Sequence, residues 1–158
     1  ASAIAIGQIG DVAAVPALTN FLNKKPNDKE RFLRRAAARS IGQIAQNLQR
    51  IEEDPLVTPE SFLPENFKEI KTPKYRRLLE SFPVFQNINA LLIKILQNKN
   101  ETDDTKREAA FALGEIGDAS AIPILTSNLN SEDYYLAEIS KEALRKVILN
   151  INLDKTNS

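Results

Sequence analysis

The chain of 158 residues contains no histidine and no cysteine. Without these side chains it cannot form a zinc site with nitrogen and sulfur ligands, a cysteine nucleophile or a Ser-His-Asp triad. Disulfides are excluded as well, which fits a reducing compartment. We therefore expect no catalytic residues, no bound metal and no cofactor, and we predict a binding protein rather than an enzyme.

Long hydrophobic runs and an excess of charge of one sign are also missing. The chain has no run of about 18 apolar residues, the length needed to span a membrane. No basic-then-apolar signal segment opens the chain. The 21 basic and 21 acidic residues balance, so nothing attracts the whole protein to nucleic acid or to an anionic membrane. These features predict a soluble, cytoplasmic protein that does not bind membranes.

What the chain does contain is a repeated unit. Residues 107–129, REAAFALGEIGDASAIPILTSNL, match residues 1–22, ASAIAIGQIGDVAAVPALTNFL, with glycines, an aspartate, a proline and leucines in register. Residues 33–44 also align with residues 105–116, and residues 136–147 do so more loosely. Internal repetition of this kind is the sequence signature of a solenoid.

Each unit predicts two helices joined by a tight corner. The first carries a stripe of small and aliphatic residues at helical spacing, Ala109, Ala110, Leu113 and Ile116. Gly117 is expected to end this helix in the left-handed conformation, and Asp118 to cap the next helix. Pro123 falls in the first turn of that second helix, whose buried stripe is predicted to be Ile122, Leu125 and Leu129. Because two such helices cannot bury both faces alone, the unit must stack on copies of itself.

The second copy is interrupted by an insertion at about residues 47–85. Five prolines lie between Pro55 and Pro83, and five of the ten aromatic residues fall between Phe62 and Phe85. This segment is too apolar for a disordered linker. It either folds back over the edge of the solenoid or forms an arm that contacts a partner.

Secondary structure can also be predicted after the first unit. Short helices are expected in the insertion at 64–70 and 73–82, and the second helix of the interrupted copy at 83–97. The last helix is expected at about 135–149. We predict one domain of residues 1–153 with a frayed tail at 154–158. Its repeats are expected at about 1–32, 33–104, 105–135 and 136–153.

The pattern R-x-A-A-x-A-L-G-x-I-G-D followed by A-x-x-P-x-L-x-x-x-L closely resembles the HEAT-like repeats of the phycobiliprotein-lyase (PBS lyase) type. The resemblance extends over everything except the insertion and the tail, although Ala45 and Arg145 replace two glycines of the pattern. It implies an all-α, armadillo-like solenoid, a right-handed alpha-alpha superhelix. Proteins resembling this family include bilin lyases, phycobilisome-degradation factors, adaptor arrays and sensor regions of bacterial signalling ATPases.

We predict a non-catalytic scaffold for protein-protein interaction, the sensor or adaptor fragment of a larger bacterial protein. A fragment is expected because Ala1 lies inside a predicted helix that lacks the R-x start of the other copies. The resemblance implies that the first helices line a concave face, where another protein would bind, with the insertion as a second contact. The positions turned away from the alanine seam are the predicted partner-binding residues: Gln8, Arg35, Arg39, Gln43, Arg107, Glu108, Phe111, Glu115, Glu142 and Lys146. Phe111 either fills a gap in the core or is an exposed anchor in the groove.

Two other functions remain open. The resemblance implies, as one alternative, a bilin-lyase-like factor that handles a chromophore together with a second subunit. Nucleic-acid binding is the other, because seven basic and two acidic residues lie between Lys24 and Arg39. The same basic stripe is also explained as a solvated face that forms ion pairs with the neighbouring repeat. The charge reverses between Glu101 and Glu142, with ten acidic and three basic residues.

Overall fold

The computed structural model describes residues 12–49 and 78–156, and within these ranges every regular element is a helix. The α-helices are α2 (Val15–Leu22), α3 (Arg31–Gln49), α4 (Leu78–Ser81), α5 (Val84–Gln97), α6 (Asp103–Ile116), α7 (Ile122–Ser127) and α8 (Tyr134–Thr156). Short 3-10 turns join them: η1 (Val12–Ala14), η2 (Asp28–Glu30), η5 (Ala119–Ala121) and η6 (Asn128–Asn130).

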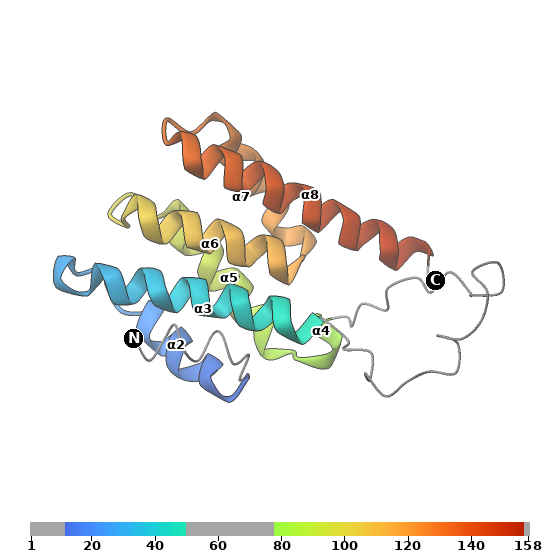
Figure 1. Cartoon of the computed structure of the whole chain (residues 1–158), viewed down its shortest axis with the longest axis horizontal. Coiled ribbons are helices and arrows are strands. Elements are labelled where there is room, and N and C mark those ends of the chain that lie inside the picture. The colour runs from blue at the N-terminus through green and yellow to red at the C-terminus, as the bar shows by residue number, and fades with distance from the viewer. Residues whose placement is uncertain (1–11, 50–77, 157–158) are drawn as a thin grey trace, which may run out of the picture.

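The helices form two layers (Figure 1). Helices α3, α6 and α8 lie side by side in one layer, and each contacts the next. Helices α2, α5 and α7 form the second layer and pack against the first. The two units with both helices described are α3 with α5 and α6 with α7, and each places its longer helix in the first layer and its shorter helix in the second. The predicted all-α solenoid is confirmed.

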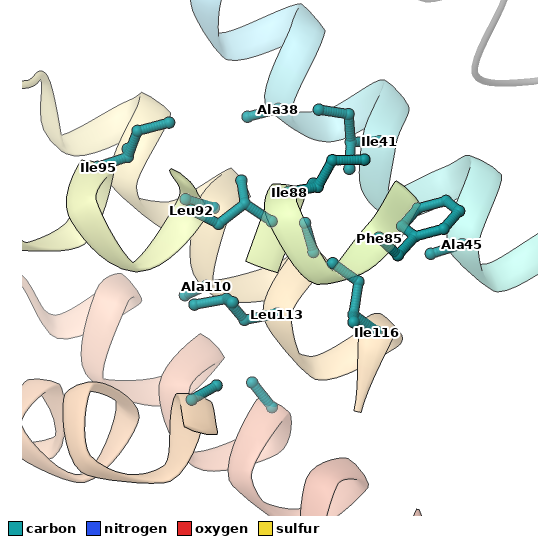
Figure 2. Close-up of a cluster of buried hydrophobic side chains, with 14 of the residues drawn as sticks. Ala38, Ile41, Ala45, Phe85, Ile88, Leu92, Ile95, Ala110, Leu113 and Ile116 are labelled. Carbon is teal, nitrogen blue, oxygen red and sulfur yellow. The ribbon is translucent and has the colours of Figure 1, made fainter. Parts of the chain in front are cut away.

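The core lies between the two layers and is built by the stripes that the sequence repeats. Figure 2 shows Phe85, Ile88 and Leu92 of α5 pointing between the apolar side chains of α3 and those of α6. The stripe of α6 is fully buried, as predicted, with Leu113 at 0% and Ile116 at 1% exposure. Burial of such aliphatic side chains stabilises the stack by about 1.5–3 kcal/mol for each residue.

Small residues set the distance between neighbouring helices of the first layer. A Cβ atom on Gly114 would lie 2.7 Å from the Cα atom of Ala143 on α8. A Cβ atom on Gly42 of α3 would lie 2.6 Å from Cε1 of Phe111 on α6. Both helical glycines therefore permit contacts that any larger residue would obstruct.

The corner between α6 and α7 has most of the features that the sequence predicts for it. Gly117 ends α6 with a φ of 76°, and its N–H donates to the Leu113 carbonyl at 3.0 Å. Pro16 and Pro123 lie in the first turns of α2 and α7. The predicted cap was wrong: the Asp118 side chain accepts no hydrogen bond from the following backbone.

Asp118 instead joins two units. Its Oδ2 atom accepts hydrogen bonds from Ser120 Oγ at 2.5 Å and from Asn89 Nδ2 on α5 at 3.1 Å. Asn89 is buried, and its Nδ2 group also donates a hydrogen bond to Ser120 Oγ at 2.6 Å, so its N–H groups bind side chains of the next unit. The Asp118 carboxylate therefore binds side chains of two units and does not cap the next helix. The neighbouring sequence does not reveal this contact.

Other helix limits differ from the sequence predictions. Leu129 is exposed rather than buried, because the chain tightens into the 3-10 turn η6 and turns this side chain off the stripe of α7. Helix α8 continues to Thr156, beyond the predicted helix end at about 149, since no glycine or proline follows Pro123 to stop it. Helix α5 begins at Val84, one residue after the predicted start, and ends at Gln97 as predicted. The helix predicted at 64–70 and most of the insertion lie outside the described residues.

Candidate partner-binding groove

Register places three different side chains in a row across the first layer. Arg39 of α3, Phe111 of α6 and Glu142 of α8 occupy the same position in the aligned units. They line a groove of about 430 Å³ on the exposed surface of this layer. Its complete lining is Arg39, Gln43, Gln46, Glu108, Phe111, Ile139, Glu142, Ala143 and Lys146.

Phe111 lies at the centre of this row and is partly buried. One edge of its ring packs on Gly42, where the absence of a side chain leaves room for the aromatic carbons. The Lys146 Nζ atom lies 5.8 Å from the ring centroid, within the range of a cation–π contact. Phe111 thus fills the space beside α3 and also forms part of the groove wall.

On the α3 side of the groove, two guanidinium groups approach one carboxylate oxygen. Glu108 Oε1 lies 3.4 Å from Arg39 Nη1 and 3.7 Å from Arg35 Nε. The Glu108 side chain is 13% exposed, whereas the arginine side chains are 45% and 50% exposed. Part of the basic stripe is therefore paired with the neighbouring unit, as one of the two interpretations of that stripe predicts.

On the α8 side, the acidic groups have cations of their own. Glu142 accepts hydrogen bonds from Arg145 at 3.0 and 2.5 Å through its two oxygens. These bonds lower the pKa of Glu142 and raise that of Arg145. Glu115 is buried and forms an ion pair with Lys146. The carboxylates of this wall are thus compensated within the protein.

Comparison with protein families gives a match to the PBS lyase HEAT-like repeat over residues 1–24 and 105–131. These two segments are HEAT-like repeats of the PBS lyase type. The second match contains α6 from Thr105 onward, the corner and α7, so the central wall of the groove belongs to a HEAT-like repeat. No curated protein matches the sequence.

The packing of α3, α6 and α8 brings many of the predicted partner-binding residues together, but not all of them. Six line the groove: Arg39, Gln43, Glu108, Phe111, Glu142 and Lys146. Arg35 borders it through Glu108. Glu115 is buried beneath Lys146, and Gln8 lies outside the described residues.

Arg107 of the same HEAT-like repeat has a different environment. Its Nε and Nη2 atoms donate to Asp133 at 2.8 and 2.9 Å, and its Nη1 atom donates to Asp104 at 3.1 Å. The guanidinium also lies 5.1 Å from the ring centroid of Tyr135. Asp133 consequently has a pKa below its ordinary value, chiefly through the bond from Arg107, while the pKa of Arg107 is raised. This side chain stabilises the junction with α8 instead of lining the groove.

Three lining residues of the groove were absent from the prediction: Gln46, Ile139 and Ala143. Ile139, Ala143 and Lys146 follow one another at spacings of four and three on α8, which places them on one helix face. This spacing could have identified Ile139 and Ala143 from the sequence. It was obscured because the last unit matches the repeat pattern only loosely.

Within the described residues, no group of three or more acidic side chains is placed to hold a metal ion. None of the described helices is long and apolar enough to cross a membrane.

Proposed function

We propose that this HEAT-like repeat protein is a non-catalytic scaffold that binds another protein through the groove on α3, α6 and α8. The observation that carries this proposal is Phe111, an aromatic side chain partly exposed at the centre of the groove and bordered by arginines. Aromatic and arginine side chains dominate the binding energy of protein interfaces. The volume of about 430 Å³ is also sufficient for a side-chain anchor of a partner. A sensor or adaptor role in the bacterial cytoplasm is part of the same proposal.

A selection of short random peptides displayed on phage tests this proposal, because it needs no identified partner. The probe is the whole chain, compared with a variant carrying Arg35→Ala, Arg39→Ala and Phe111→Ala. Peptides enriched on the wild-type chain should lose binding to this variant. Circular dichroism should show unchanged helicity, because the substituted side chains leave the core stripes intact.

A matched control removes exposed side chains from the second layer. Val84 and Lys94 lie on the exposed side of α5, away from the groove. Val84→Ala with Lys94→Ala should leave binding of the enriched peptides unchanged. Enrichment that persists equally on the groove variant would contradict the assignment of the binding face.

Chromophore handling is a second candidate, favoured by the name of the matching family. The test is incubation of the chain with bilin and an apo-phycobiliprotein, followed in the visible spectrum. A scaffold that only binds protein should cause no change in the visible band. A new band that depends on the chain would support the chromophore-handling function instead.

A further inference from the structure

Resting on the proposed function, the charges of the groove indicate the chemistry of its partner. We infer that the groove binds an acidic, amphipathic segment of another protein. An apolar side chain of that segment packs against Phe111 and Ile139, and a neighbouring carboxylate contacts Arg35 and Arg39.

The positive charge on the α3 side is only partly compensated. Arg35 and Arg39 both approach the same oxygen of Glu108, so two positive charges face one negative charge. Each guanidinium carries several N–H donors, and both side chains are about half exposed. Donors therefore remain accessible for a further acceptor at the edge of the groove. Guanidinium groups bind carboxylates with particular strength because their N–H groups match the two oxygens.

The opposite wall offers no such excess of charge. Both oxygens of Glu142 are engaged by Arg145, and Glu115 is engaged by Lys146. The net charge available to a ligand is therefore positive and lies on α3. A partner segment should carry its acidic residue at that end, and this asymmetry fixes its orientation across the helices.

Apolar side chains lie beside these charges. Phe111, Ile139 and Ala143 line the groove between α3 and the charged pairs of α8. Burying an apolar side chain here removes apolar surface of both molecules from water. An acidic residue next to an aliphatic or aromatic residue is the combination that fits both features.

The lining argues against a nucleic acid as the occupant. Nucleic acids carry a negative charge on every phosphate, and their binding requires several uncompensated cations. In this groove Glu108 and Glu142 offset most of the positive charge of the neighbouring arginines, so too few cations are left for a chain of phosphates. One excess positive charge beside an apolar surface is better matched by a single carboxylate.

The experiment uses a peptide enriched in the selection above, labelled with fluorescein, and measures binding by fluorescence anisotropy. A second version of the peptide has its Asp and Glu residues replaced by Asn and Gln. The protein variant is Arg35→Gln with Arg39→Gln, which keeps much of the side-chain volume. We expect the acidic peptide to bind this variant about tenfold more weakly than the wild type. The neutral peptide should bind both proteins equally.

A matched variant controls for the general loss of charge. Lys94 and Lys99 are exposed and do not line the groove. Lys94→Gln with Lys99→Gln removes the same charge and should leave the affinity for the acidic peptide within twofold. Circular dichroism of both variants verifies that the helices are retained.

The possible outcomes separate this inference from the proposed function. Enrichment of basic peptides, or of acidic peptides that bind the Arg35/Arg39 variant normally, would overturn the inferred partner chemistry and leave the scaffold function standing. Failure to enrich any peptide that depends on Phe111 would count against the proposed function itself. Binding of a short single-stranded RNA that requires Arg35 and Arg39, with no binding of acidic peptides, would overturn the inference in favour of nucleic acid.

Discussion

Arg34 and Glu101 form a buried ion pair in which Nη2 and Oε2 are 2.6 Å apart, with side-chain exposures of 3% and 1%. The same guanidinium donates to the carbonyl oxygens of Leu22 at 3.3 Å and Lys24 at 2.8 Å. Glu101 lies two residues before α6, Leu22 is the last residue of α2, and Lys24 follows it in the next turn. One side chain of α3 therefore joins the end of the preceding unit to the loop that leads into α6.

Replacing Arg34 by methionine should destabilise the protein by about 3–5 kcal/mol, because Glu101 would remain buried without its counter-charge. Urea unfolding monitored by circular dichroism measures this loss. Arg34→Met combined with Glu101→Leu should recover much of it, since an apolar pair replaces the charged one. A single variant as stable as the wild type would show that the pair is not buried in solution.

The ion pair of Arg107 with Asp133 provides a comparison at the next junction. The Arg107 side chain is 29% exposed, so solvent screens its interaction more strongly. Arg107→Met should cost about 1 kcal/mol or less in the same urea experiment. A loss as large as that of Arg34→Met would contradict the role assigned to burial.

The low pKa of Asp133 predicts a dependence of stability on pH. Its folded-state pKa lies below the ordinary value of 3.8, so its contribution is complete above that value and is lost as the pH falls through the folded-state pKa. Asp133→Asn keeps an acceptor oxygen before α8 but removes the charge that pairs with Arg107. The variant should therefore be less stable than the wild type at pH 6, by about 1 kcal/mol or less.

At pH 3 the difference between Asp133→Asn and the wild type should be smaller, because pH 3 lies below the ordinary pKa of 3.8 and the stabilising contribution of the carboxylate decreases below that value. Urea unfolding at both values gives the comparison. A difference that grows toward low pH would have the wrong sign for a lowered pKa.

The glycines between the first-layer helices predict two different responses to alanine. In Gly114→Ala the new methyl would meet the backbone of Ala143 at 2.7 Å, which only a movement of α8 can relieve. We expect a loss of about 1–3 kcal/mol despite the higher helix propensity of alanine. Thermal unfolding provides the measurement.

In Gly42→Ala the new methyl would meet the ring of Phe111, which is a side chain. Gly42→Ala should therefore be destabilising alone and much less so when combined with Phe111→Leu. The combination of Gly114→Ala with Phe111→Leu should show no such rescue, because Gly114 meets Ala143. Equal behaviour of the two glycines would contradict this distinction.

Removal of the Asp118 carboxylate tests its contact with α5. Asp118→Ala leaves the buried amide of Asn89 without one of its acceptors, at a cost of about 1–3 kcal/mol. In a double-mutant cycle with Asn89→Ala, the two effects should be coupled rather than additive. Additive effects would instead favour a role confined to the corner between α6 and α7.

The sequence predicted those features that depend on neighbouring residues. Gly117 had to be left-handed because it follows a helical stripe and precedes a new helix, and Pro123 could only be accommodated in a first turn. The buried stripe of α6 followed from its helical spacing alone. These elements repeat along the chain, so each copy supported the others.

Features that depend on partners far away in the chain were not predicted. Arg34 was counted with the basic stripe, since nothing near it indicates that Glu101, 67 residues later, neutralises it. Glu115 and Arg107 were both expected on the partner-binding surface for the same reason. Their partners Lys146 and Asp133 belong to α8 and to the turn before it, and only the packing of successive units brings them together.

The packing of Phe111 against Gly42 has an evolutionary consequence. A larger residue at position 42 would displace the ring, so the two positions, which belong to adjacent units, cannot diverge independently. Homologues in which the aromatic residue is lost should tolerate side chains at the glycine, and those that retain it should not. Ligand preference in such an array would then change by paired substitutions on two adjacent helices rather than one residue at a time.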